Sequence, residues 1–141
     1  MSNLKSLVYV SSATRNLSQA EIDHLLLSAR ERNEKYNVTG VLMYIGGNFM
    51  QCIEGTVDNV ELIYEIIKAN SLHHGIIQLL YRPIEFRDFK DWEMAYCTKE
   101  KTVSVAPYNH EDILSSKLGT SSFKKTPSRI LLHSFWRSNS A

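Results

Sequence analysis

The chain has 141 residues, which is a suitable length for one domain with a sizeable core. Charged residues make up 22% of it and the formal net charge is +1, so no strong field would concentrate nucleic acid or an anionic membrane on its surface. The sequence contains no apolar run near the roughly 20 residues of a membrane-spanning helix, and no basic segment followed by an apolar one at its N-terminus. We therefore expect a cytoplasmic protein with no nucleic-acid or membrane partner.

The chain opens with a predicted strand followed by a predicted helix. Residues 5–11 are rich in β-branched and aromatic side chains, which favours a strand with Tyr9 on one of its faces. After a polar loop, Ser18 and Glu21 have the spacing of a capping box. Apolar residues then recur at helical spacing, so we expect a helix over residues 19–37 that packs on a sheet.

A hairpin is predicted next, and it carries an unusual residue. Two apolar runs, 41–45 and 49–53, are joined by Gly46-Gly47-Asn48, which supplies the positive φ of a tight turn. Gln51 lies in the middle of the second run, where its amide has about four hydrogen-bonding sites. Each site left unmet in a core costs about 1 to 3 kcal/mol. The phenol of Tyr9 together with a polar ligand would satisfy them.

The second half completes a recognisable order of elements. A helix is expected from Thr56 to about Asn70, followed by a strand over residues 76–81 that ends at Pro83, and by a fifth strand over residues 92–97. This order predicts an α+β fold of the ferredoxin-like βαββαβ type with an additional fifth strand. Right-handed crossovers would put both helices on one sheet face, and we expect the first and third strands to be adjacent, central and parallel.

The C-terminal part differs in composition from the rest. From about Lys99 the sequence becomes polar, and helices are expected only at residues 111–118 and 128–136. We expect them to cover the opposite face of the sheet. The sequence therefore suggests a domain at residues 1–98 and a C-terminal helical extension at residues 99–141.

Several motifs occur together and in order between residues 4 and 98. They are Leu-Val-Tyr-Val-Ser-Ser at 7–12, Asn33 seven residues before the Gly of Val-Thr-Gly-Val-Leu at 38–42, Phe-Met-Gln-Cys-Ile-Glu-Gly at 49–55, His-His at 73–74 and Phe-Lys-Asp-Trp-Glu-Met at 89–94. In this combination the chain resembles the BLUF domains, blue-light sensors that use flavin. The resemblance implies the same ferredoxin-like fold that the order of elements predicts.

The resemblance also implies a photochemical site. FAD would lie between the two helices with its ring end toward the sheet, and Tyr9 would be the electron donor. Gln51 would lie between the Tyr9 hydroxyl and the flavin N5 and O4 region, and its rotation or tautomerisation would produce a modest red shift. Trp92 and Met94 would form the switch, one exchanging for the other beside Gln51 and so altering the strand and the covering helices.

Five further positions would hold the cofactor if the family pattern applies. Asn33 would hydrogen-bond the carbonyl edge of the ring, and Leu25 and Ile67 would sandwich the ring. Ordinary core packing predicts the same burial for these two apolar residues. Asn70 and His73 match positions near the flavin chain.

Two positions depart from the family pattern. Asn70 and Leu72 stand where the family often has an aspartate and an arginine. The contacts to the ribityl and phosphate groups would therefore differ in this chain. Lys68 and Arg32 are the basic residues that would compensate.

Other functional classes share this fold plan. An acyl-phosphate or phosphoester hydrolase would need a phosphate-cradling loop after the first strand, where the sequence offers Arg15 but no glycine cradle. An RNA-binding module would be expected to carry positive charge and a basic aromatic motif. No nucleophile lies on a recognisable strained turn, and the adjacent His73 and His74 would point opposite ways in a strand, so neither catalysis nor a metal site is expected.

The expected output is a protein interaction. With no output domain after residue 98, a stand-alone short sensor would signal to a downstream protein or change its own state as a homo-oligomer. The apolar segment 130–136 suits either role. Alternatively, this segment is a helix packed on the back face of the sheet.

Overall fold

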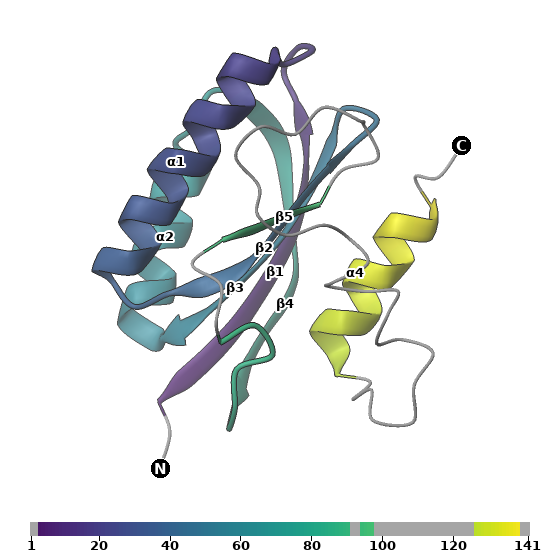
Figure 1. The fold of residues 1–141 in the computed structure, drawn as a ribbon. Helices are drawn as coiled ribbons and strands as arrows, with labels where there is room; N and C mark the ends of the chain where they lie inside the picture. The colour runs from purple at the N-terminus through teal and green to yellow at the C-terminus, as the bar shows by residue number, and fades with distance from the viewer. Residues whose placement is uncertain (1–2, 91–93, 98–125, 139–141) are drawn as a thin grey trace.

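The computed structural model describes residues 3–90, 94–97 and 126–138. Within these residues a five-stranded sheet has the order β4-β1-β3-β2-β5, with α1 and α2 on one face and α4 on the other (Figure 1). The elements in chain order are β1 (Leu4–Ala13), α1 (Gln19–Lys35), β2 (Thr39–Ile45), β3 (Asn48–Thr56), α2 (Val57–Lys68), β4 (His73–Ile84), β5 (Ala95–Cys97) and α4 (Pro127–Ser138). The expected ferredoxin-like plan with an added strand is confirmed.

One expectation about the sheet is wrong. The first and third strands are adjacent and central as predicted, but β1 and β3 run antiparallel rather than parallel. The crossover through α1 makes β2 run in the same direction as β1, and the hairpin then turns β3 back between them. The added strand β5 pairs with β2 in parallel at the edge of the sheet.

The local signals of the first half are reproduced closely. Gly46 and Gly47 have φ values of 60° and 81°, as a two-residue hairpin between paired Ile45 and Asn48 requires. The capping box of Ser18 and Glu21 is formed at the start of α1. The helix ends at Lys35, slightly before the expected end, because Asn37 adopts a left-handed φ of 53° and leaves the helix.

The late strands have different limits from those expected. Strand β4 continues through Pro83, which was predicted to end it, and Pro83 pairs with Lys5 of β1. An edge strand needs ladder partners on one side only and therefore tolerates proline. Strand β5 begins at Ala95 rather than at residue 92, and residues 91–93, including Trp92, lie outside the described residues.

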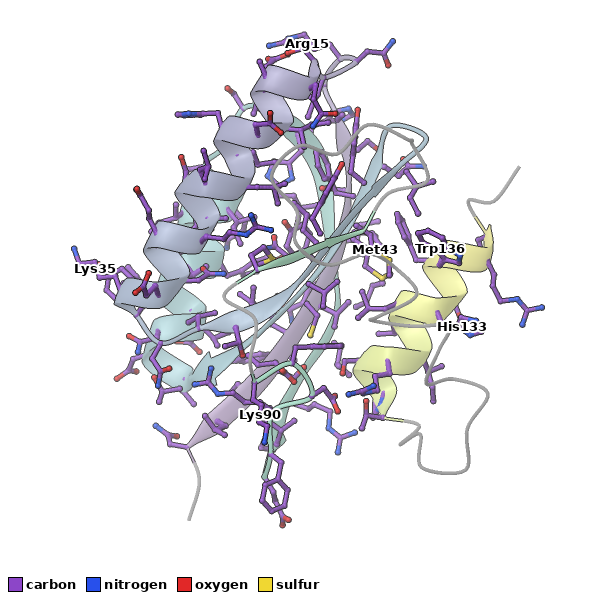
Figure 2. All side chains as sticks on the ribbon, in the orientation of Figure 1. Arg15, Lys35, Met43, Lys90, His133 and Trp136 are labelled. Atoms are coloured by element: carbon purple, nitrogen blue, oxygen red, sulfur yellow. The ribbon has the colours of Figure 1, made fainter. Side chains whose placement is uncertain are left out.

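Alternation along the strands builds two apolar layers. Leu7 and Tyr9 of β1 face the layer beneath α1 and α2, whereas Val8 faces the layer beneath α4. Leu132 and Phe135 of α4 are buried in that second layer. Figure 2 shows Met43 of the sheet on the side that faces α4 and Trp136. The helix expected at 128–136 is thus confirmed on the back face, while the one expected at 111–118 lies outside the described residues.

Among the described residues, no helix combines the length and the apolarity needed to cross a membrane.

Candidate functional site

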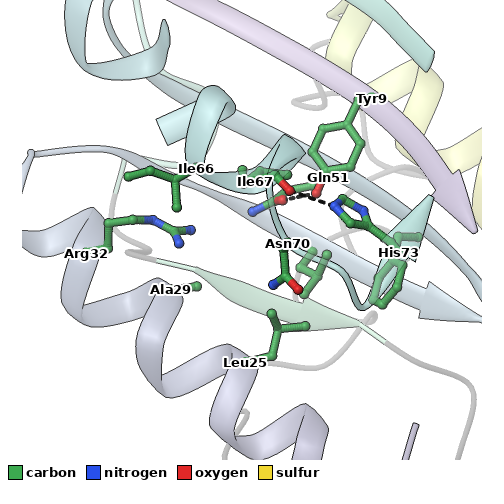
Figure 3. Close-up of a pocket in the computed structure, with 11 residues that line it drawn as sticks. Tyr9, Leu25, Ala29, Arg32, Gln51, Ile66, Ile67, Asn70 and His73 are labelled. Carbon is green, nitrogen blue, oxygen red and sulfur yellow. Dashed lines mark hydrogen bonds between the residues drawn. The ribbon is translucent and has the colours of Figure 1, made fainter. Parts of the chain in front are cut away.

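A pocket opens between α1 and α2, on the face of the sheet that these two helices cover (Figure 3). We call this the front face, and the face that α4 covers the back face. Its cavity volume is about 60 Å³, which is well below the roughly 300 to 1,000 Å³ of typical small-molecule sites. The two helices, the central strands and the turn after α2 all contribute to its lining. The lining residues are Tyr9, Leu25, Ala29, Arg32, Leu42, Phe49, Gln51, Ile66, Ile67, Asn70 and His73.

Tyr9 and Gln51 form a buried polar pair in the wall of this pocket. They lie directly opposite each other on β1 and β3, and the Tyr9 hydroxyl donates a hydrogen bond to Oε1 of Gln51. Their side chains are only 3% and 4% exposed. Burial raises the pKa of Tyr9 above its ordinary value, so the phenol keeps its proton and remains a donor. The adjacency expected from the strand order is therefore present.

The nitrogen of the same carboxamide has a weaker partner. Nε2 of Gln51 donates to Sδ of Met94 at 3.6 Å, and Met94 is only 1% exposed. A thioether sulfur is a weak acceptor, so the carboxamide is held firmly at its oxygen and loosely at its nitrogen. Of the two predicted switch residues, Met94 is the one that contacts Gln51 among the described residues, and Trp92 falls outside them.

The apolar walls come from the two helices. Leu25 and Ala29 of α1 line one side, and Ile66 and Ile67 of α2 line another, as Figure 3 shows. The two residues expected to sandwich a ring, Leu25 and Ile67, are thus brought to one pocket from different helices. A flat apolar group fits between such walls better than a charged one.

Arg32 is one of the two basic residues that the sequence offers as compensating contacts. It lines the pocket, and its Nε atom is buried without a hydrogen-bond partner in the part of the chain that the structure describes. Burial lowers the pKa of the Arg32 guanidinium, and this cation in turn opposes the rise in the pKa of Tyr9. A signal was present in the sequence, because Leu25, Ala29 and Arg32 have the spacing of one helical face.

Two other residues predicted to contact the cofactor, Asn33 and Lys68, do not line the pocket. Asn33 is fully buried in α1 but is not among the residues that line the pocket, and its backbone oxygen accepts a bond of 2.8 Å from Val38. Lys68, the other basic residue considered, forms an ion pair with Glu65 at 2.5 Å, and both side chains are substantially exposed. Of the two basic candidates, only Arg32 faces the pocket.

Asn70 and His73 shape the end of the pocket beyond α2. Asn70 Oδ1 accepts a hydrogen bond of 2.9 Å from the Leu72 backbone, which turns the chain toward β4. His73 Nε2 lies 2.7 Å from the backbone oxygen of Ile67, so this nitrogen donates and Nδ1 accepts from the Ser11 hydroxyl at 2.8 Å. The imidazole is therefore fixed by bonds on both sides.

Comparison with known proteins agrees with this geometry. Residues 4–95 match the family model described as BLUF, sensors of blue-light using FAD. The chain is 30% identical over 133 residues to a photoactivated adenylate cyclase subunit beta of Euglena longa, which covers 92% of this chain and 15% of that protein. It is 28% identical over 125 residues to the blue light- and temperature-regulated antirepressor BluF of Escherichia coli (strain K12), covering 87% of this chain and 30% of that protein. The chain thus spans only a small part of both relatives.

Solved structures show the same fold. The dark-state structure of BlrB, a BLUF protein, has a TM-score of 0.71 and 26% identity, and the match covers 96% of both chains. The ground state of BlsA matches with a TM-score of 0.69 and 22% identity, covering 92% of this chain and 85% of that one. The family-model match favours the sensor over the hydrolase and RNA-binding alternatives. Because the family model spans most of its length, this chain belongs to the BLUF family of flavin-binding blue-light photoreceptors.

Proposed function

We propose that this chain binds FAD in the pocket between α1 and α2 and senses blue light through the hydrogen bonds of Gln51. The observation that carries the proposal is the bond from the Tyr9 hydroxyl to Gln51 Oε1 in the pocket wall. An oxidisable phenol and a carboxamide that can turn are held in contact there. Within the described residues, the wall contains no cluster of His, Cys, Asp or Glu suited to a metal ion.

The chemistry of the residues present fits a flavin, and the two helices would have to stand further apart than in this structure, with its cavity of about 60 Å³, to admit the ring. Leu25 and Ile67 offer apolar walls for a planar ring, and the buried Nε of Arg32 offers a donor to an electronegative ligand atom. Tyr9 and Gln51 complete the side next to the sheet. FAD is proposed rather than a smaller flavin because it is the cofactor in the family description. Asn33, Asn70 and His73 stay predicted contacts.

Tyr9 and Gln51 carry the proposed photochemistry. Flavin, when bound, supplies a ring that absorbs blue light and is a strong oxidant in its excited state. Tyr9 is the proposed electron donor, and its phenolic proton already faces an acceptor, the Oε1 atom of Gln51. Gln51 can then turn about its terminal bond, which exchanges the positions of its oxygen and nitrogen. The return of the electron and the proton to Tyr9 closes the cycle.

Signalling needs an element with two stable arrangements. One rearranged hydrogen bond contributes about 0.5 to 1.5 kcal/mol, which shifts a two-state equilibrium only about three- to tenfold. Strand β5 is a suitable element, because it has three residues, lies at the sheet edge and follows Met94 directly. Met94 also contacts Gln51, so a turn of the carboxamide changes the packing at this strand.

The proposed output is a protein interaction, transmitted through the sheet to α4. Strands β1 and β3 carry Tyr9 and Gln51 on their front face, and Val8 and Cys52 pack under α4 on their back face. We take residues 1–98 as the sensor domain and residues 99–141 as the extension that carries the output. We propose that the chain has no catalytic activity of its own. The partner is a downstream signalling protein or a second copy of this chain, and a cytoplasmic location stays the prediction from sequence.

The test is spectroscopic. The purified chain should be yellow, its released cofactor should match FAD rather than FMN or riboflavin, and blue light should shift its absorption reversibly to the red. Gln51→Leu should keep the cofactor and lose the shift, whereas Met50→Leu, the neighbouring substitution on the opposite face, should keep both. A normal light-induced shift in Gln51→Leu would contradict the proposed switch.

A further inference from the structure

Arg30 forms a contact across the fold that none of the site residues above accounts for. It is half-buried on α1, and its Nε atom donates a hydrogen bond of 2.9 Å to the backbone oxygen of Met94. The two residues are 64 positions apart in the chain. Met94 immediately precedes β5, so this bond ties α1 to the start of that strand.

Strand β5 is short, and the side chain of its Tyr96 is buried in the apolar layer beneath α1 and α2. Its ladder with β2 consists of three residue pairs, beginning at Val41 opposite Ala95, and it lies at the edge of the sheet. A short edge strand is among the least stable parts of a fold. A hydrogen bond from a charged donor is stronger than one between neutral groups. The bond from Arg30 therefore adds to the ladder with β2 and to the packing of Tyr96 in positioning this strand.

Met94 makes contacts with Arg30 and with Gln51 through different atoms. Arg30 holds its backbone oxygen, and Gln51 Nε2 lies 3.6 Å from its sulfur. The oxygen of the same Gln51 carboxamide accepts the Tyr9 hydroxyl. A continuous series of contacts thus joins the guanidinium of α1 to the phenol of β1 through one methionine and one glutamine.

We propose that Arg30 is a positioning residue for the light switch, which holds the Met94 thioether against Gln51 and so favours the carboxamide orientation that accepts from Tyr9. This inference rests on the function proposed above. Arg30 is not among the residues that line the pocket, so its effect passes through Met94. Loss of the bond should leave Met94 in more than one position, and the return to the dark arrangement should be slower because Met94 must be ordered again during that step.

The test uses the flavin-bound chain labelled with ¹³C at its methionine methyl groups. The chain has four methionines, and the Met94 resonance can be assigned from Met94→Leu. Arg30→Leu removes the donor and keeps an apolar stem, and Arg30→Lys keeps a cation with a different geometry. Lys35→Leu is the matched control, because Lys35 is an exposed cation on the same helix, with its ammonium over Tyr36.

We expect the Met94 methyl resonance to shift or broaden in Arg30→Leu, to change less in Arg30→Lys and to stay unchanged in Lys35→Leu. Dark recovery should slow by about threefold or more in Arg30→Leu, the effect of one lost hydrogen bond. Should Arg30→Leu not fold, Arg30→Lys provides the same comparison.

The two proposals fail in different ways. A wild-type chain that photocycles, with Met94 resonance and recovery unchanged in Arg30→Leu, overturns the positioning role alone. A flavin-bound wild-type chain without a light-induced shift overturns the proposed function and the switch role together.

Discussion

Ser128, at the start of α4, donates a hydrogen bond of 2.6 Å to the carboxylate of Asp88 and so ties the C-terminal helix to the segment after β4. Thr126 donates to the same carboxylate at 2.8 Å, and Arg129 forms an ion pair with it at 3.3 Å. The backbone N–H of Asp88 donates in turn to the buried carboxylate of Glu54 on β3 at 3.0 Å. The central strand, the segment after β4 and the back helix are therefore connected by polar contacts as well as by apolar packing.

Asp88→Ala should weaken the attachment of α4 to the rest of the fold without releasing flavin from the pocket. It removes the acceptor of Ser128 and Arg129, and half-buried donors left unmet cost about 1 to 3 kcal/mol of unfolding free energy. Hydrogen exchange of the α4 amides should therefore become faster, while flavin binding is kept. Glu85→Ala, a change at a nearby exposed carboxylate, is the control. Equal protection of α4 in both variants would show that apolar packing alone holds this helix.

Glu54 should make stability depend on pH. Burial raises the pKa of Glu54 from its ordinary value of 4.5 to about 7, although the N–H groups of Asp88 and Phe89 oppose the rise. Between these two pH values the folded chain binds more protons than the unfolded chain, so this group's contribution to the unfolding free energy decreases as pH rises. The decrease should be up to about 3 kcal/mol.

The comparison of wild type with Glu54→Gln isolates this effect, since the amide does not titrate. In urea unfolding from pH 4.5 to pH 7, the wild type should lose stability relative to Glu54→Gln. Glu85→Gln, at an exposed position, should follow the wild type. If the curves for wild type and Glu54→Gln stay parallel over this range, Glu54 titrates below it in the folded chain.

Tyr9→Phe should separate binding from photochemistry. The phenyl ring keeps most of the packing of Tyr9, so the flavin should remain bound, but the reversible red shift should disappear because the electron and proton donor is gone. The variant should also lose about 1 to 3 kcal/mol of unfolding free energy, since Oε1 of Gln51 loses its donor. Tyr44→Phe changes another buried tyrosine on the same sheet face and should keep the shift. A normal shift in Tyr9→Phe would mean that another residue is the donor.

Arg32→Met should weaken flavin binding. The substitution keeps an unbranched side chain in the wall but removes a half-buried cation whose Nε atom is buried. Loss of a charged hydrogen bond at such a site should lower the affinity for flavin by about tenfold. The affinity is measured by titrating FAD into flavin-free protein. Lys68→Met, which removes an exposed cation paired with Glu65, should bind as the wild type does. Equal losses in the two variants would indicate a general charge effect rather than a contact by Arg32.

The sequence by itself determined the local features of this protein. Period-two alternation separated Leu7 and Tyr9 from Val8, and the structure has them in opposite apolar layers. The glycines at the hairpin and the capping box at Ser18 also form as predicted. The order of elements and the spacing of the motifs were sufficient to predict the fold and the family. All of these depend on residues close together in the chain or on the order of segments.

Tertiary structure alone decided how distant segments meet. Pro83 lies within a strand because β4 is at the sheet edge. Strand β3 runs antiparallel to β1 because the hairpin places it between β1 and β2, which run in the same direction. The bond from Arg30 to Met94 does not follow from periodicity alone. Periodicity states which face of an element a side chain occupies, but the partner on that face is set by the packing of elements from elsewhere in the chain.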